Sequence, residues 1–593
     1  MRYHALAADY DGTLAHHGKI EEATWVALRK LKDSGRRLIM VTGRELDELL
    51  ELVPHPEVFD RIVAENGGVV YEPAIKEVRT IAPGPSAAFV SELVRRGVTR
   101  ISVGRVIVAT WEPHQEKVLG VIKDQGLELQ VIFNKGSVMI LPSGVNKATG
   151  LAVALDELGL SRHNVVGVGD AENDISLLAA CECGVAVQNA LPSLKQTADL
   201  VTDHHHGAGV SELIGHLLDN DLVATASRIK RHRVLLGKHA EREISIDPYS
   251  ANIMVCGTSG SGKSTLTTGL LERLCKTGYQ FAIVDPEGDY TAVETAVVLG
   301  GPKRAPLVDE VMDVVKDPHD NVVINLLGVA VDHRPEVFSQ LMPALADLRS
   351  RTGRPHWLVI DAAHHMLPAS WEPAADFPAR PHGTLYITVH PTSVSRFLLS
   401  KIDTVIAVGE HPEVTLREFA EAAKIGVPPC PVVDKLVPGH VMYWKIGSDP
   451  IEVISEKPKM ERTRHSRKYT EGNLGHDRSF FFRGPDAKLN LKAHNLQLFI
   501  HLGAGVDDDT WNHHLRAGEY STWLRTEVKD GDLADEIAKV EADASLSPAA
   551  SRAAIKAAIE KRYTLPADAP SGIVDKVPPA AGAAAIKAEQ KVR

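Results

Sequence analysis

The first eleven residues constrain the fold of this chain more than any other segment. A short apolar run, His4 to Ala8, ends in two carboxylates on alternate residues, Asp9 and Asp11. Such a run predicts a buried strand, and open parallel sheets bind their ligands at the carboxyl ends of their strands. The helical stretch Glu21 to Lys32 and a second apolar run, Arg37 to Val41, follow. The chain therefore begins as strand, helix and strand, with two acidic groups at the edge of the sheet where ligands bind.

Two further apolar runs, Arg61 to Ala64 and Asn164 to Val168, alternate with helical stretches. This alternation is typical of an open parallel sheet with helices on both faces, and so of an α/β domain. Between residues 82 and 141 the pattern changes to strand-rich segments. We interpret this part as a cap inserted into a first domain that spans residues 1–218.

Three motifs follow Asp9 in chain order, each at the end or edge of a predicted strand. The first offers the hydroxyl of Thr42 and the backbone amide of Gly43. Lys147 supplies a fixed cation, and the acidic segment Asp170 to Asp174 brings oxygen ligands that suit Mg²⁺. A carboxylate beside Mg²⁺ can attack phosphorus, while a second carboxylate protonates the leaving oxygen and later activates water. Together the motifs predict phosphoryl-group chemistry.

With these motifs and the segment Ala64 to Tyr71, the chain resembles the haloacid dehalogenase superfamily, in its branch with a strand-rich cap (subclass IIB, similar to Cof-type and sucrose phosphatases). The resemblance covers residues 1–218. It implies a Rossmannoid core with an α+β cap, and a Mg²⁺-dependent phosphomonoester hydrolase that works through an aspartyl-phosphate. By this resemblance Asp9 is the nucleophile and Asp11 the acid-base group. Thr42 and Lys147 would be the catalytic phosphate binders, and further phosphate contacts would come from Gly43, Arg44 and Asn173. The metal ligands would be Asp9, Asp11, Asp170 and Asp174. The alternative is a phosphatase fold retained as a sensor with little turnover.

A second site is predicted where an apolar strand, Ala251 to Cys256, meets the helix Leu266 to Lys276 through a glycine-rich loop. Glycines let backbone amides wrap phosphates, Lys263 reaches the outer phosphates, and the Ser264 hydroxyl binds Mg²⁺. The residues predicted to bind ATP here are Gly257, Ser259, Gly260, Ser261, Gly262, Lys263, Ser264 and Thr265.

A later strand, His356 to Asp361, ends in a carboxylate that would hold the water shell of the same Mg²⁺. This strand, its continuation to His365, and Val284 to Tyr290 resemble HerA-FtsK-type ATPases, which have a RecA-like P-loop fold and often form hexameric rings. Ala362 stands where that class has a water-activating Glu, so we expect ATP to bind while hydrolysis is slow. Both a natural loss and an introduced change would leave this alanine. His390 stands where the class senses the γ-phosphate.

These patterns set the remaining boundaries. A linker with lead-in strands spans residues 219–248, the ATPase domain 249–455, and a mostly helical C-terminal domain 456–565. We predict that the tail, residues 566–593, is disordered because it is rich in Ala, Pro and Lys. Three segments of the C-terminal domain have helical spacing: Leu489 to Leu502, Asp508 to Arg516 and Thr522 to Val540.

The basic run Arg462 to Lys468 precedes Ser479 to Pro485, which holds three phenylalanines. Basic residues beside aromatics can bind a nucleic-acid backbone and stack bases. The alternative is a solvated linker followed by a buried strand. The nearby pair His513 and His514 has no third metal ligand close in sequence.

Composition excludes some classes of partner. A formal net charge of −11 argues against a chain that coats nucleic acid or an anionic membrane, since those partners select a basic surface. The five cysteines do not show zinc-site spacing, and no signal peptide or long apolar run occurs. We expect a cytoplasmic protein with no membrane partner.

Three whole-chain hypotheses stay open. In the first, a phosphatase acting on a small phosphorylated substrate is fused to an ATP-binding and ATP-hydrolysing module that controls assembly or access. In the second, a nucleic-acid-processing ring ATPase carries an end-phosphatase, as in defence or repair. In the third, the chain is an ATP-gated scaffold. All three use Mg²⁺ and ATP, and the HerA resemblance implies a homo-oligomer.

Overall fold

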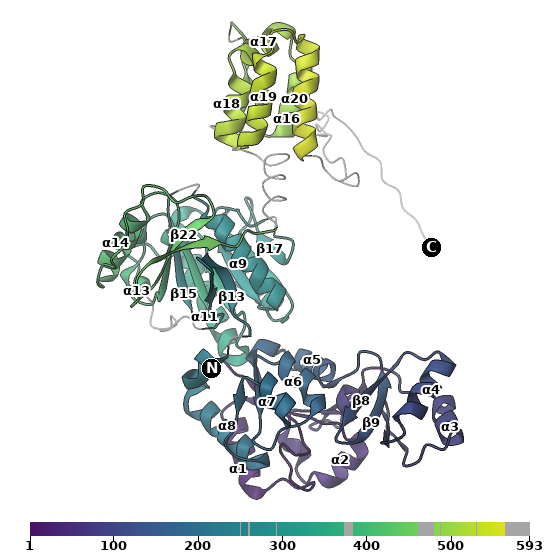
Figure 1. Cartoon of the computed structure of the whole chain (residues 1–593). Helices are drawn as coiled ribbons and strands as arrows, with labels where there is room; N and C mark the ends of the chain where they lie inside the picture. Colours follow the sequence, from purple (N-terminus) through teal and green to yellow (C-terminus); the bar gives the residue numbers. More distant parts are fainter. Residues whose placement is uncertain are drawn as a thin grey trace, which may run out of the picture. The chain divides into compact units, whose positions relative to one another are not determined.

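The computed structural model describes residues 1–229, 231–249, 251–258, 261–291, 293–372, 383–459, 479–486, 488–528 and 530–563. The chain divides into two compact units, Met1–Lys459 and Met460–Arg593. The first unit holds two domains built on separate sheets (Figure 1). No helix among the described residues combines the length and apolarity needed to cross a bilayer. The predicted tail, residues 566–593, and the basic run at 462–468 lie outside the described residues.

An eight-stranded sheet forms the core of the first domain, in the order β12-β11-β10-β1-β2-β3-β4-β5. Its strands are β1 (Ala5–Ala8), β2 (Arg37–Val41), β3 (Arg61–Ala64), β4 (Val69–Glu72), β5 (Glu77–Thr80), β10 (Val165–Gly169), β11 (Cys183–Ala186) and β12 (Leu200–Val201). All are parallel except β4 and β5, which form an antiparallel edge. Because β1 pairs with both β10 and β2, the residues that follow these three strands meet at one edge of the sheet.

Helices cover this sheet in pairs. Its helices are α1 (Glu22–Asp33), α2 (Leu46–Leu52), α5 (Lys147–Glu157), α6 (Ile175–Ala180), α7 (Pro192–Thr197) and α8 (His206–Asn220). The pair α1 and α8 pack on each other, and so do α5 and α6. The central strands are apolar and fully buried, as expected for a sheet covered on both faces.

The cap is a separate antiparallel sheet in the order β6-β7-β9-β8. Its elements are α3 (Ala87–Arg95), β6 (Ser102–Val103), β7 (Val108–Trp111), α4 (Gln115–Gln125), β8 (Leu129–Asn134) and β9 (Ser137–Pro142). Figure 1 shows α3 and α4 on the side of this sheet that faces away from the first domain's core. A small apolar core that includes Phe89, Val118 and Ile140 joins these helices to the sheet, and the opposite face of the sheet is left for the site below.

The second domain is an eleven-stranded sheet in the order β14-β13-β23-β22-β21-β15-β20-β19-β16-β18-β17. Its strands are β13 (Val234–His239), β14 (Arg242–Ile246), β15 (Asn252–Cys256), β16 (Phe281–Asp285), β17 (Ala296–Gly300), β18 (Asn321–Asn325), β19 (Trp357–Ile360), β20 (Thr384–Thr388), β21 (Thr404–Ala407), β22 (His440–Lys445) and β23 (Ile451–Ser455). Its helices are α9 (Lys263–Thr277), α10 (Val308–Val315), α11 (Arg334–Thr352), α12 (Ala363–Met366), α13 (Arg396–Leu399) and α14 (Pro412–Ala423). Strand β20 lies between β15 and β19, so the ends of all three adjoin.

The C-terminal unit is a helical domain with one small hairpin, β24 (Phe480–Phe482) and β25 (Leu491–Ala493). Its helices are α16 (Leu496–Gly505), α17 (Asp508–Arg516), α18 (Glu519–Trp523), α19 (Gly531–Ala542) and α20 (Pro548–Tyr563), with a π-helical turn at Leu524–Val528. Two predictions are wrong in part. The segment from 489 forms β25 first, because Asn495 caps α16 by accepting from the Leu498 amide. The helix expected over 522–540 divides into two at Asp530, which caps α19.

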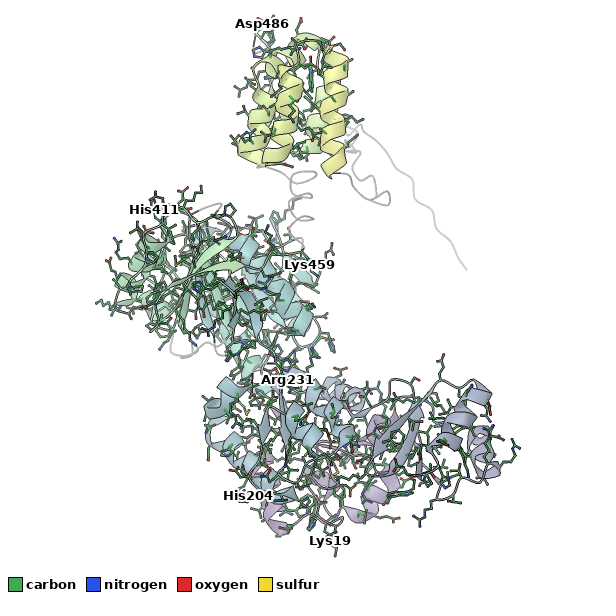
Figure 2. All side chains as sticks on the ribbon, viewed as in Figure 1. Lys19, His204, Arg231, His411, Lys459 and Asp486 are labelled. Carbon is green, nitrogen blue, oxygen red and sulfur yellow. The ribbon has the colours of Figure 1, made fainter. Side chains whose placement is uncertain are left out.

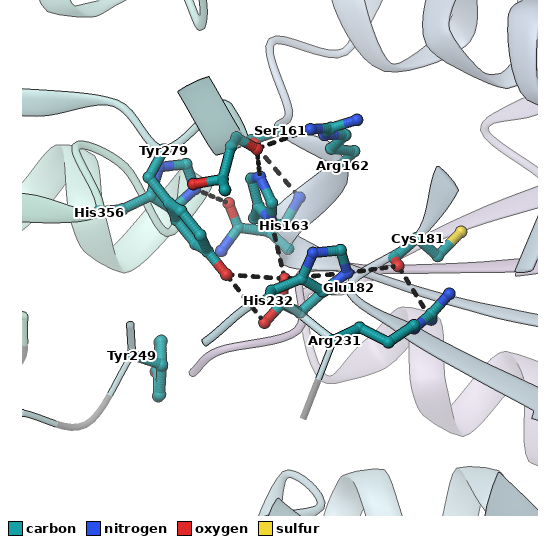
Figure 3. Close-up of polar contacts among 12 residues, drawn as sticks. Ser161, Arg162, His163, Cys181, Glu182, Arg231, His232, Tyr249, Tyr279 and His356 are labelled. Carbon is teal, nitrogen blue, oxygen red and sulfur yellow. Dashed lines mark hydrogen bonds and ion pairs between the residues drawn. The ribbon is translucent and has the colours of Figure 1, made fainter. Parts of the chain in front are cut away.

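A buried polar junction joins the two domains of the first unit (Figure 3). The Glu182 carboxylate, 2% exposed, accepts from the Tyr279 hydroxyl at 3.0 and 3.1 Å and pairs with Arg2 at 2.5 Å. The His163 ring stacks on Tyr279 with centroids 3.8 Å apart. Arg354, fully buried, donates to the Gly159 carbonyl at 2.6 Å. Because Glu182 and Arg354 each have a hydrogen-bond partner in the other domain, separating the domains would break buried hydrogen bonds to charged groups.

The segment that follows α8 is also fastened to the first domain. Arg231, labelled in Figure 2, donates to the Leu178 carbonyl at 3.0 Å and pairs with Asp199 at 2.6 Å. These contacts fix the start of the linker before β13 begins.

The junction predicts a loss of stability in mild acid. His4 is 1% exposed, and burial lowers its pKa to about 4. The unfolded chain therefore protonates His4 near pH 6.5, whereas the folded chain keeps it neutral until the pH approaches 4. The free energy of unfolding is thus highest above pH 6.5 and falls as the pH drops toward 4. A shift of this size corresponds to about 2 kcal/mol between pH 7.5 and pH 5. Burial also lowers the pKa of His356, which acts in the same direction.

The measurement is the free energy of unfolding against pH for the wild type, His4→Gln and a control, His216→Gln, at an exposed position. We expect a shallower slope between pH 7.5 and pH 5 in His4→Gln only. An unchanged slope in that variant would show that His4 is not the group that titrates.

Candidate active sites

Three carboxylates gather where β1 and β10 end. Asp9, Asp170 and Asp174 are 4%, 2% and 0% exposed, and one oxygen from each lies within 4.8 Å of the others. Burial, and then the charge of Asp174, raise the pKa of Asp9; burial likewise raises the pKa of Asp170. This edge of the sheet therefore concentrates negative charge that needs a cation.

Lys147 is the buried cation of this group. It opens α5, whose start is fixed by a capping box between Asn146 and Thr149. Its Nζ lies 2.5 Å from Asp9 Oδ1 and 2.6 Å from Asp174 Oδ1, and the residue is 1% exposed. Burial alone would lower the Lys147 pKa, but the two carboxylates outweigh it and raise that pKa. Asp9 Oδ2 has no hydrogen bond within the described chain, which leaves it as the free oxygen of the pair.

The donor set fits a divalent cation. Asp170 Oδ1 is buried and has no hydrogen-bond partner in the described structure, although its carboxylate lies among other acids. Asp174 Oδ2 is held by the amides of Asp170 and Ala171 at 2.9 and 3.0 Å. Hard oxygen ligands held at fixed positions are the ligands that Mg²⁺ prefers. Asp9, Asp170 and Asp174 are therefore the residues that would hold it.

Asp11 lies apart from this group. Its carboxylate is bonded on both oxygens by Arg44, at 2.6 and 2.8 Å, and the side chain is 43% exposed. Arg44 also pairs with Glu48. In this arrangement Arg44 positions Asp11 and does not point freely toward a phosphate. Of the four predicted metal ligands, the side chains of Asp9, Asp170 and Asp174 come together and that of Asp11 does not.

Besides Lys147, the predicted phosphate binders include Thr42, Gly43 and Asn173. Thr42, 0% exposed, directly follows β2, and its hydroxyl accepts from the Arg44 amide at 3.2 Å. A Cβ placed on Gly43 would lie 3.6 Å from Asn173 Nδ2. Asn173 donates to Asn66 Oδ1 at 3.1 Å, and Asn66 Nδ2 is buried without a partner in the described residues. Asn66 adds a donor that the motif analysis did not assign.

Sequence reasoning also missed how the cap is held. Glu65, 1% exposed, accepts from the amides of Arg105, Val106 and Ile107 at 3.0, 2.7 and 3.0 Å. The signal available in the sequence was a Glu directly after the apolar run Arg61 to Ala64. Lys135, at the tip of the cap's β8 and β9 hairpin, reaches Asp170 Oδ2 at 2.7 Å; in the sequence it is an ordinary turn lysine.

The second site lies in the second domain at the start of α9. Lys263 Nζ donates to the carbonyls of Gly257 and Thr258 at 2.8 and 2.9 Å, so it folds over its own loop. Gly262 has φ of 101°, which favours glycine, and Ser261 Oγ is buried without a partner in the described part. The predicted Ser264 and Thr265 follow on the first turn of α9, while Ser259 and Gly260 lie outside the described residues.

Asp361 follows β19 and is 6% exposed. Burial, with the nearby charges of Asp285 and two other acids, raises its pKa to about 7. This surplus of negative charge fits a Mg²⁺ beside the phosphates. Ala362 next to it has φ of 43° and is 6% exposed, so the expected carboxylate position holds only a methyl group. His364 Nδ1 lies 3.2 Å from the Thr388 hydroxyl at the end of β20, and the predicted His390 is exposed just beyond.

Other candidate residues are used structurally. The resemblance to ring ATPases also predicts an arginine that acts on a neighbouring subunit, with Arg349, Arg351 and Arg354 as candidates. Arg349 donates to the carbonyls of Pro355 and His356 and Arg354 is fully buried, while the Arg351 side chain is 64% exposed. In the C-terminal unit Phe480 and Phe482 are 6% and 0% exposed. They cannot stack on bases, so the buried-strand alternative holds for them.

The histidine pair does gain a third possible ligand, the acid Glu519, contrary to expectation. His513, His514 and Glu519 place one donor atom each within 4.8 Å of the others. However, His514 Nε2 accepts from the amides of Arg483 and Gly484, and its Nδ1 lies 2.5 Å from Glu519. Both ring nitrogens already have a structural role.

Comparison with known families matches both domains of the first unit. The model of haloacid dehalogenase-like hydrolases matches residues 6–93 and 101–214, on both sides of a gap within the cap. The model of the helicase HerA central domain matches residues 235–344.

The individual relatives named here each cover about a third of this chain. A phosphoglycolate phosphatase of Natronomonas pharaonis is 32% identical over 228 residues, which is 36% of this chain and 98% of that protein. A second phosphoglycolate phosphatase, from Methanothermobacter thermautotrophicus, is 30% identical over 226 residues, covering 35% of this chain and 96% of that protein. A solved sugar phosphatase of subclass IIB is 21% identical with a TM-score of 0.32, over 36% of this chain and 98% of that one.

Proposed function

Since the chain belongs to the haloacid dehalogenase-like hydrolases and carries a HerA-type domain behind its phosphatase domain, we propose that it hydrolyses a small phosphomonoester with Mg²⁺ through an aspartyl-phosphate. One observation carries the proposal. Asp9, Asp170, Asp174 and Lys147 form one buried group in which Asp9 Oδ2 and Asp170 Oδ1 have no hydrogen-bond partner in the described chain, so one oxygen can attack while the other can face a cation. The charges of this group suit the transfer of a phosphoryl dianion.

Each residue then has a defined step. Asp9 Oδ2 attacks phosphorus, the ester P–O bond breaks, and Asp11 gives its proton to the departing oxygen. Asp11, held by Arg44, next removes a proton from water, which attacks phosphorus and frees Asp9. Lys147 favours the ionised form of Asp9 and orients the side chain, because it binds the other oxygen. Bound Mg²⁺ would offset the negative charge of the phosphoryl oxygens.

The substrate we propose first is 2-phosphoglycolate, since the two relatives reported above are named as phosphatases of this compound. The experiment is release of inorganic phosphate from 2-phosphoglycolate and from p-nitrophenyl phosphate, with Mg²⁺ and with excess chelator. We expect release with both compounds and none with chelator. Release that survives the chelator would contradict the metal requirement, and no release from either compound would contradict the phosphatase.

We also propose that ATP in the second domain controls the phosphatase. The helix α9 starts at Lys263, and its last carbonyl, on Thr277, accepts from Arg162 and His163 of the first domain at 2.6 and 2.8 Å. Strand β19 runs toward Asp361, and His356 before it lies 3.1 Å from Asn164 Oδ1. Helix α9 and strand β19 each carry a predicted ATP-site residue at one end and contact the phosphatase domain at the other end.

In the phosphatase domain, one residue of these contacts adjoins the strands that carry the proposed catalytic carboxylates. Asn164 directly precedes β10, which ends before Asp170. The Asn164 carbonyl also accepts from the His4 amide at 2.7 Å, just before β1 and Asp9. A shift of α9 or β19 on ATP binding would thus act on the two strands that carry the site. Rigid elements that both sites bias can couple them by 1–3 kcal/mol, a factor of about 5 to 150.

Tyr279→Phe tests this control. The change removes only the hydroxyl that donates to Glu182, and hydrogen bonds to charged groups contribute about 1.5–3 kcal/mol. We expect ATP to change kcat/KM of the wild-type phosphatase at least about 5-fold, and expect a smaller change in Tyr279→Phe with similar activity in the absence of ATP. Tyr443→Phe, on β22 away from the junction, is the control. The same ATP effect in all three proteins would rule out control through this contact.

Assembly into a ring, binding of nucleic acid and a cytoplasmic location stay predictions. Slow ATP hydrolysis at Ala362 belongs to the same proposal, because a module that binds ATP without rapid turnover suits a control element better than a motor.

A further inference from the structure

The cap presents a cation to the catalytic carboxylates that the mechanism above does not use. Lys135 Nζ lies 2.7 Å from Asp170 Oδ2, and its side chain is 48% exposed while that of Asp170 is 2% exposed. Within the described part of the cap, Lys135 is the one residue whose side chain hydrogen-bonds a carboxylate of the catalytic group. A half-exposed ammonium with a single buried partner is available to a ligand.

The fold fixes where this ammonium lies. Lys135 and Gly136 have φ of 47° and 86° and join the paired residues Asn134 and Ser137 of the hairpin. Two-residue turns with both central residues in the left-handed region match the twist of their strands and hold a hairpin tip firmly. Lys135 is therefore aimed by β8 and β9, not carried on a loose loop.

The tip lies directly over the loop that carries the nucleophile. A Cβ built on Gly12 would lie 3.0 Å from Lys135 Nζ and 2.2 Å from Asp170 Oδ2. The cap's neighbouring contact is apolar, since the Met139 methyl group lies 3.0 Å from a Cβ built on Gly43. The cap thus offers the reaction centre one thioether and one ammonium.

The other cations here are committed. Lys147 is shared by Asp9 and Asp174, and Arg44 holds both oxygens of Asp11. Lys135 pairs only with Asp170, which is one of the residues that would hold Mg²⁺. Once a divalent cation offsets the Asp170 charge, the ammonium faces the substrate with its own charge uncompensated.

We propose that Lys135 is a specificity-determining residue that binds a carboxylate carried by the leaving group of the phosphomonoester. The proposal rests on the proposed phosphatase function and adds the residue that would select its substrate class, phosphoesters of short hydroxy acids. The charge match selects it, because an ammonium at fixed position discriminates an anionic leaving group from a neutral one of the same length.

The test compares two substrates that differ at one group, 2-phosphoglycolate and 2-hydroxyethyl phosphate. The proteins are the wild type, Lys135→Met, Lys135→Arg and a control, Lys123→Met, at an exposed cap position. We expect Lys135→Met to lower kcat/KM for 2-phosphoglycolate roughly 10- to 100-fold, as for loss of a charged hydrogen bond, with little change for 2-hydroxyethyl phosphate. Lys135→Arg should recover much of the preference, and Lys123→Met should equal the wild type.

A binding measurement separates this role from support of Asp170. In the Asp9→Asn background with Mg²⁺, calorimetry should show weaker binding of 2-phosphoglycolate, and unchanged binding of 2-hydroxyethyl phosphate, when Lys135→Met is added. The proposal would be overturned if Lys135→Met weakened binding of both substrates equally, or if it changed only the Mg²⁺ concentration that the enzyme needs. In either case Lys135 would act through Asp170. If the wild type releases phosphate from neither substrate, the phosphatase function itself fails, which is a different result.

Discussion

Asp9→Asn is expected to lower phosphatase activity by about 10⁴-fold or more, because an amide oxygen cannot form the acyl phosphate on which both chemical steps depend. The substitution keeps the shape of the side chain, so Lys147 can still donate to it and the burial of the group is unchanged. The measurement is phosphate release from p-nitrophenyl phosphate at saturating Mg²⁺.

Two controls make this result specific. Asp33→Asn, at an exposed position at the end of α1, should match the wild type. ATP binding by the second domain should also be the same in Asp9→Asn, which shows that the variant is folded. If Asp9→Asn retains substantial phosphatase activity while folded, the nucleophile lies elsewhere and the sensor alternative gains support.

Ala362→Glu is expected to raise ATP hydrolysis by about 10²-fold, since a positioned general base contributes 10²- to 10⁴-fold. Ala362 follows the carboxylate of Asp361 directly, and it already has the left-handed backbone at φ of 43° that any replacement would adopt. A carboxylate here would lie beside the phosphates where water must be oriented. ATP affinity should change little, because the loop and Lys263 provide the binding.

Ala362→Gln is the matched control, since it has the size of Glu without the charge. It should hydrolyse ATP as slowly as the wild type. Equal rates in Ala362→Glu and Ala362→Gln would show that the missing carboxylate does not limit hydrolysis. A fast wild type would point instead to another group on these strand ends, of which His364, bonded to Thr388, is the nearest described candidate.

Much of the fold was predictable because the strands of parallel sheets are continuous apolar runs. In the two large sheets of the first unit, the strands β1, β2, β3, β10, β15 and β19 fall on apolar runs identified in the sequence. The C-terminal unit shows the limit. Residues 491–493 lie in a segment with helical spacing but pair with β24, because a short apolar segment fits either period and a tertiary partner decides between them.

The catalytic motifs were equally predictable, since Asp9, Thr42, Lys147 and Asp170 follow strands or begin helices and so must gather at one edge. Side-chain roles within the motifs were not. Arg44 was expected to contact phosphate, whereas the structure pairs it with Asp11. The difference arises because a guanidinium chooses among nearby carboxylates by geometry that sequence does not encode.

The sequence by itself determined which residues make up the two candidate sites: acidic residues with a lysine at one sheet edge, and a glycine-rich loop whose partner strand is followed by Asp361 and Ala362. These follow from residue types next to strand ends. Only the tertiary structure decided what surrounds these residues. It placed Lys135 over Asp170 and set Glu182 between the two domains. Both contacts join residues more than thirty positions apart, so packing of separate elements, not local pattern, brings them together.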